Sequence, residues 1–329
     1  MLEKPNLADE KIMAALRDRY GIEAAAIEFL PLGNDATAWV YRAVGEGGTA
    51  YFLKLKKGAV YEPSVTIPRF LKDNGIEQAV APLPTQHGKL WAAVESFALI
   101  LYPFIDGRSG MDVGLSDAQW LELGGILRKM HAIQLQAELA AQIQRESFVP
   151  HWAALVRAFA VKIPVTAYEN PYAKALAAFW LERAAQITRI VERAEALGRI
   201  LQSRSLPFVL CHADIHIANV LVDGAGKLHI VDWDQPVLAP KERDLMFMLN
   251  TPGEALFFEG YGEAAVDWTA FAYYRYEWVV QELGDYAGRV FTLDDVGDDT
   301  RADAVRGFRQ LFDPGDVVDE AYAADKKLN

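Results

Sequence analysis

Residues 211–219 read CHADIHIAN, and residues 230–234 read IVDWD. The first stretch lies between two apolar runs, and a turn at residues 223–224 precedes a third run. This pattern predicts a strand, a polar loop and then a β-hairpin. The two strands of that hairpin would bring Asp232 next to Asn219.

The spacing of the polar residues indicates a particular chemistry. Asp214 precedes Asn219 by five positions, as in the kinase catalytic loop H-x-D-x-x-x-x-N. Phosphoryl transfer from ATP needs a carboxylate that accepts the hydrogen bond of the attacking hydroxyl, and hard oxygen ligands for Mg²⁺. Polar residues beside short strands are also ordinary turn formers, and a lone H-x-D is common by chance. The fixed offsets of His212, Asp214, Asn219 and Asp232 between apolar runs favour the catalytic interpretation.

Length and composition limit the remaining possibilities. The chain has 329 residues, of which 52% are hydrophobic, so disorder of the whole chain is excluded. At roughly 100–200 residues per domain, this length predicts two domains or one large unit with two lobes. The net charge of −12 argues against a general nucleic-acid binder, which would need a basic surface to bind phosphates. The charge suits a cationic small-molecule substrate, or serves solubility alone.

The cysteine count and apolar windows predict the compartment. Cys211 is the single cysteine, so no intrachain disulfide and no cysteine-based zinc site can form. The N-terminal residues contain no apolar signal region. The most apolar window, 91–105, is shorter than a membrane span and contains Glu95. We therefore expect a cytoplasmic protein without a membrane partner.

The hydrophobic periodicity changes along the chain. After a helix at 9–20, alternation and turn residues predict strands, which are followed by a helix at 65–73 and a further strand pair. Ser116 is a plausible N-cap for a helix that ends at His131, and mostly helical patterns follow. The sequence thus predicts an α+β chain, with a β-rich N-terminal lobe at 1–103 and a helical lobe at 104–329.

These motifs carry a family resemblance that spans most of the chain in order. The loop resembles that of the aminoglycoside phosphotransferase and choline kinase-like superfamily, H-G-D-L-H-x-x-N followed by I-D-W/F. The run PKERDLMF at 240–247 is similar to spectinomycin phosphotransferase-like proteins in particular. Further matching stretches are 51–56 and 101–105. Ala213 and Ala218 depart from the common pattern, because glycine is frequent at both positions.

The resemblance implies a bilobal, protein-kinase-like fold and assigns roles within the loop. Asp214 would be the catalytic base, and Asn219 and Asp232 the Mg²⁺ ligands. His212 would support the loop from behind, and His216 would do the same or line the site. The remaining two roles concern Asp234, which would face the substrate or a second metal, and Asp244, which would anchor the loop through backbone hydrogen bonds.

The N-terminal half supplies candidates for nucleotide binding. The resemblance favours Lys54 for the α- and β-phosphates, although Lys56 lies on the same face of the strand, because side chains alternate. Glu62 is the nearest carboxylate that could pair with this lysine, although Pro63 directly follows it. A phosphate-covering loop is expected between the first strands, with Gly33, Asn34 and Thr37 as candidates. The resemblance implies in addition an adenine-binding hinge that contains Tyr102 and Phe104.

Together these features predict an ATP- and Mg²⁺-dependent phosphotransferase. Its acceptor would be a hydroxyl of a small, cationic molecule, such as an aminoglycoside or aminocyclitol antibiotic like spectinomycin. Aromatic and acidic residues at 273–282 could line an acceptor site, but such stripes more often form core. Two alternatives stay open: a kinase of a metabolic alcohol such as choline, homoserine, methylthioribose or a sugar amine, and a non-catalytic pseudokinase that binds nucleotide.

Overall fold

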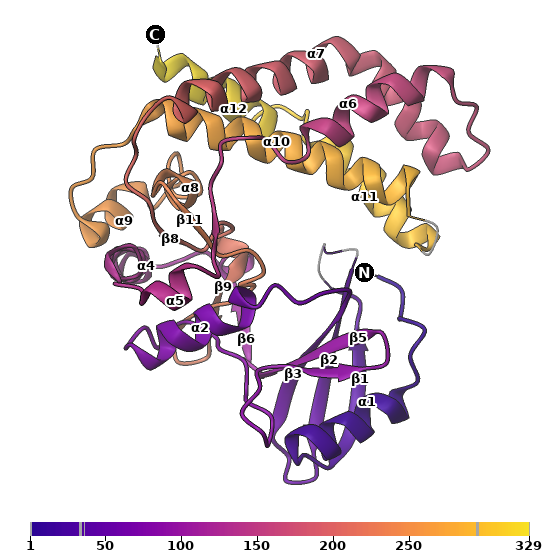
Figure 1. Ribbon diagram of the computed structural model, residues 1–329, viewed down its shortest axis with the longest axis vertical. Coiled ribbons are helices and arrows are strands. Elements are labelled where there is room, and N and C mark those ends of the chain that lie inside the picture. Colours follow the sequence, from indigo (N-terminus) through magenta and orange to yellow (C-terminus); the bar gives the residue numbers. More distant parts are fainter. Residues whose placement is uncertain (1, 33–34, 36, 294–295, 329) are drawn as a thin grey trace. The chain divides into compact units, whose positions relative to one another are not determined.

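The computed structural model describes residues 2–32, 35, 37–293 and 296–328 (Figure 1). The chain forms two compact units, each made of two segments. The first unit contains residues 1–145 and 209–264, and the second contains residues 146–208 and 265–329. The boundary predicted at 103/104 falls within the first unit, and the division into two lobes there stays a prediction.

The N-terminal part of the first unit is an antiparallel sheet of five strands in the order β1-β2-β3-β5-β4. Its strands are β1 (Ala24–Leu30), β2 (Ala38–Gly45), β3 (Ala50–Lys57), β4 (Ala92–Val94) and β5 (Phe97–Pro103). All five fall where alternation and turn residues predict them. In the central strand β3, Lys54 is opposite Val40 on one side and Ile100 on the other. Strands on both sides therefore fix the position of its backbone.

Two helices belong to the same part of the chain: α1 precedes β1, and α2 lies between β3 and β4 in sequence. Helix α1 (Asp9–Ala15) continues as a π-helical turn at Leu16–Tyr20 and ends at Gly21, whose φ of 70° is left-handed. Helix α2 (Pro63–Asp73) begins with proline in its first turn, where the missing N–H costs no hydrogen bond. Both helices lie close to their predicted positions, and α2 starts two residues earlier than expected.

The rest of the first unit joins helices to two small sheets. The helices are α3 (Gly110–Val113), α4 (Asp117–Ala132), α5 (Ala137–Ala140), α8 (Glu242–Leu245) and α9 (Glu254–Tyr261). The sheets have the orders β10-β9-β6 and β7-β11-β8. Their strands are β6 (Gly107–Ser109), β7 (Gln144–Arg145), β8 (Val209–Cys211), β9 (Val220–Asp223), β10 (Leu228–Ile230) and β11 (Val237–Ala239).

Two sequence features explain the position of helix α4. Ser116 caps the helix as predicted, in a capping box with Gln119. Helices α4 and α9 approach closely at glycines: a Cβ at Gly124 would lie 2.0 Å from the carbonyl oxygen of Phe257, and one at Gly260 would lie 1.9 Å from that of Leu121. Only glycine permits this contact between the two backbones.

The second unit is helical. It contains α6 (Ala153–Lys162), a 3₁₀ turn at Ile163–Val165, α7 (Pro171–Gln202), α10 (Trp268–Phe291), α11 (Asp298–Gln310) and α12 (Val317–Asp325), with a final 3₁₀ turn at Lys326–Leu328. Figure 1 shows α7 and α10 as the long helices of this unit. Tyr273 and Tyr274 of α10 are fully buried, and Tyr276 is nearly so. The core interpretation of these tyrosines is therefore confirmed.

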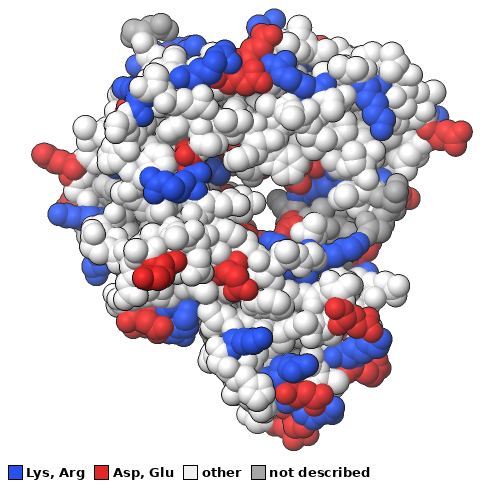
Figure 2. All heavy atoms as spheres, in the orientation of Figure 1, with Lys and Arg blue, Asp and Glu red and all other residues white. Residues whose placement is uncertain are grey.

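Charged side chains of both signs are mixed on the surface in view (Figure 2). On the face drawn in Figure 2, and for the described residues, Lys and Arg lie among Asp and Glu and do not form one continuous basic stripe. None of the helices in the described part of the chain is both long and apolar enough to cross a membrane.

Candidate active site

The loop between β8 and β9 holds Asp214 against Asn219. The side-chain amide of Asn219 donates to the backbone oxygen of Asp214 at 2.8 Å and to its Oδ2 at 3.1 Å. His216 Nε2 lies 3.5 Å from Asp214 Oδ1. Burial raises the pKa of the Asp214 carboxyl. The hydrogen bond and electrostatic effect of His216, together with the electrostatic effects of His212 and Arg243, outweigh burial, so this pKa lies below its ordinary value. Asp214 is therefore an ionised acceptor at neutral pH, and its side chain is about half exposed.

A buried carboxylate fixes the backbone of this loop. Asp244 of α8 accepts the N–H of His212 at 3.0 Å and that of Ala213 at 2.8 Å, and it is fully buried. These are the backbone hydrogen bonds predicted for Asp244. Ala213 has a φ of 74°, which a residue with a Cβ adopts only at a cost. The two hydrogen bonds therefore hold a strained turn directly before Asp214.

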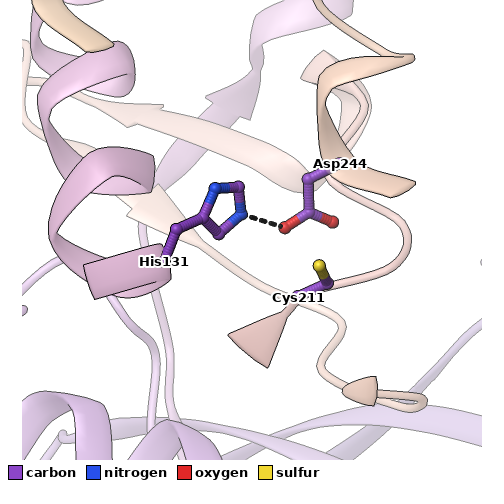
Figure 3. A group of neighbouring side chains, drawn as sticks. All are labelled: His131, Cys211 and Asp244. Atoms are coloured by element: carbon purple, nitrogen blue, oxygen red, sulfur yellow. Dashed lines mark hydrogen bonds and ion pairs between the residues drawn. The ribbon is translucent and has the colours of Figure 1, made fainter. Parts of the chain in front are cut away.

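Behind the loop, His131 and Cys211 lie beside Asp244 (Figure 3). His131 Nε2 is 3.0 Å from Asp244 Oδ2, and its Nδ1 is 2.8 Å from the hydroxyl of Tyr261. Cys211 Sγ is 3.6 Å from the carbonyl oxygen of Pro240. One ligand atom from each of His131, Cys211 and Asp244 lies within 4.8 Å of the others, as in a metal site. Because hydrogen bonds already engage His131 and Asp244, we assign this cluster to holding the loop, a role that the sequence did not indicate for His131.

His212 connects the loop between β8 and β9 to Val231, which lies between β10 and Asp232. Its Nδ1 lies 3.2 Å from the backbone N–H of Asp214, and its Nε2 lies 3.0 Å from the carbonyl oxygen of Val231. Nδ1 must therefore accept and Nε2 must donate, which assigns the tautomer from the hydrogen-bond network. The ring is fully buried against Trp233, at 4.4 Å between centroids. The structure thus places His212 behind the loop.

The hairpin of β9 and β10 brings the second acidic residue to Asn219. Val220 is opposite Ile230, and the N–H of Val231 donates to the carbonyl oxygen of Asn219 at 3.0 Å. Asp232 follows with a φ of 61°, and its side chain is about half exposed. The amide oxygen of Asn219 and the carboxylate of Asp232 are the hard oxygen donors that suit Mg²⁺.

Two lysines of β3 form ion pairs with the aspartates that follow β10. Lys54 Nζ lies 3.0 Å from Asp232 Oδ1 and 2.7 Å from Asp234 Oδ1. Lys56 Nζ lies 2.9 Å from Asp234 Oδ2 and 3.5 Å from Asp35 Oδ2. Burial lowers the pKa of the Lys54 ammonium, but Asp232 and Asp234 outweigh it and raise this pKa well above its ordinary value. Lys54 therefore stays charged although it is buried.

Glu62 is not brought to Lys54, which corrects the predicted pairing. It directly precedes Pro63 at the start of α2, and its carboxylate accepts a hydrogen bond from Trp91 Nε1 at 3.0 Å. The carboxylates at Lys54 come instead from residues 232 and 234. A pairing across 178 to 180 positions of chain leaves no signal in local spacing.

The remaining nucleotide-binding candidates lie at the ends of strands: Thr37 directly precedes β2, and Tyr102 and Phe104 lie at the end of β5. Thr37 donates its N–H and its hydroxyl to Asp35 Oδ1, each at 2.7 Å. Tyr102 lies opposite Phe52 near the end of β5, and Phe104 directly follows that strand, with Arg42 over its ring at 5.1 Å. The predicted residues Gly33 and Asn34 lie outside the described residues.

Comparison with known proteins identifies a family and several similar structures. The model of the phosphotransferase enzyme family (APH) matches residues 28–278. A crystal structure of spectinomycin phosphotransferase APH(9)-Ia with ADP and spectinomycin is 34% identical, with a TM-score of 0.86 over 98% of this chain and 100% of that one. Its AMP-bound complex is 35% identical, with a TM-score of 0.82 over 97% and 99%. Protein StrN of Streptomyces griseus is 25% identical over 285 residues, which are 84% of this chain and 83% of that protein.

The family model covers most of the chain, and the predicted α+β, kinase-like fold is confirmed by the similarity to spectinomycin phosphotransferase. The chain belongs to the phosphotransferase enzyme family, whose members transfer phosphate.

Proposed function

We propose that this enzyme transfers the γ-phosphate of ATP to a hydroxyl of spectinomycin or a closely related aminocyclitol. The observation that carries the proposal is the 34% identity to spectinomycin phosphotransferase, which extends over 98% of this chain and all of that one. That relative was crystallised with ADP and spectinomycin. The net charge of −12 is also compatible with a cationic acceptor.

The residues around the loop can perform the transfer. Asp214 is ionised at neutral pH, so its carboxylate can accept the hydrogen bond of the acceptor hydroxyl and, as transfer proceeds, its proton. The hydrogen bond from the Asn219 amide to Oδ2 orients this carboxylate, and a second one holds the backbone oxygen of Asp214. Lys54 is a buried, charged ammonium that can bind the phosphates. Catalysis then depends on positioning and charge, as phosphoryl transfer requires.

A divalent cation fits the donor set of this site. The amide oxygen of Asn219 and the carboxylate of Asp232 would hold Mg²⁺, since the backbone hydrogen bond from Val231 keeps the two residues adjacent. When bound, Mg²⁺ neutralises charge that develops on the phosphate oxygens.

The test is ADP release from ATP and Mg²⁺ with a panel of acceptors: spectinomycin, other aminoglycosides, choline and homoserine. Asp214→Asn serves as the control, because it keeps the shape of the side chain and removes the base. We expect spectinomycin to stimulate ADP release in the wild type and not in the variant. Stimulation by choline or homoserine alone would replace the acceptor, and ATP binding without turnover on any acceptor would contradict the proposal.

A further inference from the structure

The phosphate-binding lysine of a kinase is usually paired with a carboxylate from a helix. Helix α2 of this chain cannot supply that group. Its only acidic residue is Asp73 at the C-terminal end, which pairs with Arg69 one turn earlier. Glu62, directly before the helix, bonds to Trp91. The carboxylate for Lys54 must therefore come from another part of the fold.

We propose that Asp234 takes this place: it positions Lys54 and Lys56 and is not a metal ligand. This inference rests on the proposed function and concerns the same site. Asp234 uses a different oxygen for each lysine, with Oδ1 at 2.7 Å from Lys54 Nζ and Oδ2 at 2.9 Å from Lys56 Nζ. The two lysines lie on the same face of β3, where their charges would repel each other without a carboxylate between them.

The local backbone separates the roles of the two aspartates. The left-handed φ of Asp232 turns the chain, and Trp233 is buried, with its Nε1 donating to the carbonyl oxygen of Ile230 at 3.0 Å. Asp232 stays next to Asn219 and is about half exposed, whereas only 24% of the Asp234 side chain is exposed. Both oxygens of Asp234 are engaged by ammonium groups, so a cation that binds there would compete with a lysine at either oxygen.

The ion pair with Asp234 stabilises the charged, buried ammonium group of Lys54. A buried ammonium without a partner is costly. If the Asp232 carboxylate binds a metal ion, Lys54 loses its ion pair with Asp232 and keeps the one with Asp234. Asp234 still pairs with Lys54 in that state, because it comes from a position beyond the turn and does not share the metal. The lysine can therefore face phosphate without being left unpaired.

The first experiment tests the pair in the chain without ligands. Lys54→Met, Asp234→Asn and the double variant are compared by urea unfolding, which requires no catalytic activity. We expect the double variant to lose less stability than the sum of the single losses, because each single variant leaves a charge of this network without a partner. Glu62→Gln is the matched control, and its effect should add to that of Lys54→Met. Additive losses for Lys54 and Asp234 would overturn the inference. Asp234→Ser replaces Asp234→Asn if the latter does not fold.

The second experiment separates lysine positioning from metal binding. Binding of Mn²⁺, as a paramagnetic substitute for Mg²⁺, to the complex with ADP is followed by electron paramagnetic resonance. Asp232→Asn should weaken Mn²⁺ binding by about tenfold or more. Asp234→Asn should resemble Asp35→Asn, which removes a carboxylate from Lys56 without removing a metal ligand. A loss in Asp234→Asn equal to that in Asp232→Asn would overturn the inference. If the wild-type complex binds no Mn²⁺, the proposed function fails, and the unfolding experiment alone decides the lysine pair.

Discussion

Replacing Asp244 by asparagine should destabilise the chain, because the change leaves buried N–H donors without an acceptor. Oδ1 accepts from Ala213, while Oδ2 accepts from His212 and lies 3.0 Å from His131 Nε2. Asparagine has one side-chain oxygen. If its amide places that oxygen at the Oδ2 position, the hydrogen bond from Ala213 is lost; in the opposite orientation, the contacts with His212 and His131 are lost. An unsatisfied buried donor costs about 1–3 kcal/mol. We therefore expect a loss of at least this size in the free energy of unfolding.

Urea unfolding at pH 7, followed by circular dichroism, measures this loss. Asp223→Asn is the matched control, because Asp223 also accepts two backbone N–H groups and contacts a histidine, but in an exposed hairpin turn. Water can replace its bonds, so the control should lose much less stability. Equal unfolding of wild type and Asp244→Asn would refute the role of Asp244.

The difference in the free energy of unfolding between wild type and Asp244→Asn should also depend on pH. Burial raises the pKa of Asp244, but its hydrogen bonds and the nearby histidines outweigh burial, so the folded-state pKa lies below the ordinary value. A lowered carboxyl pKa stabilises the fold above the unfolded-state pKa of about 3.9, and this stabilisation is lost as the pH falls further. The gap between wild type and Asp244→Asn should therefore begin to close only below about pH 4. Closure between pH 7 and pH 5 would contradict an ionised Asp244.

Three further predictions concern the loop and its supporting helices. Asp214→Asn should lower kcat by about 10²–10⁴-fold, as expected for loss of a general base, and wild-type turnover in steady-state kinetics would contradict that role. Gly124→Ala should cost about 1–3 kcal/mol in urea unfolding, because its Cβ would collide with the backbone of α9. Gly125→Ala, with its nearest atom 4.0 Å away, should be neutral or stabilising, and equal losses would refute the close approach. Ala213→Gly should raise the unfolding midpoint because it relieves a φ of 74°, whereas Ala218→Gly in the 3₁₀ turn Ile217–Asn219 should lower it. A lower midpoint for Ala213→Gly would count against strain at that residue.

Local patterns were sufficient for the parts of the site that one short segment builds. The turn at Asp223 and the two apolar runs beside it predict the hairpin that brings Asp232 to Asn219, and the structure contains that hairpin. Alternation and turn residues likewise predict the five strands that the structure joins into the sheet carrying Lys54. Strands β6, β7 and β11 were not predicted. They have two or three residues and pair with distant segments, so no hairpin turn marks them, as one does for the equally short β4 and β10.

Pairings between distant segments could not be predicted in this way. Glu62 is close to Lys54 in sequence, yet Asp234 reaches the lysine because the fold brings their segments together. His131 meets Asp244 across 113 positions, at the end of a helix whose pattern indicates only a buried face. The motif that contains Asp234 does not indicate Lys54 as its partner, and His131 belongs to no motif.

The most direct test of the proposed transfer is mass spectrometry of spectinomycin after incubation with the enzyme, ATP and Mg²⁺. We predict that spectinomycin gains one phosphate with the wild-type chain and remains unmodified with Asp214→Asn. Unmodified spectinomycin with a folded wild-type chain that binds ATP would contradict spectinomycin as the acceptor. Equal phosphorylation by the wild type and Asp214→Asn would contradict Asp214 as the base.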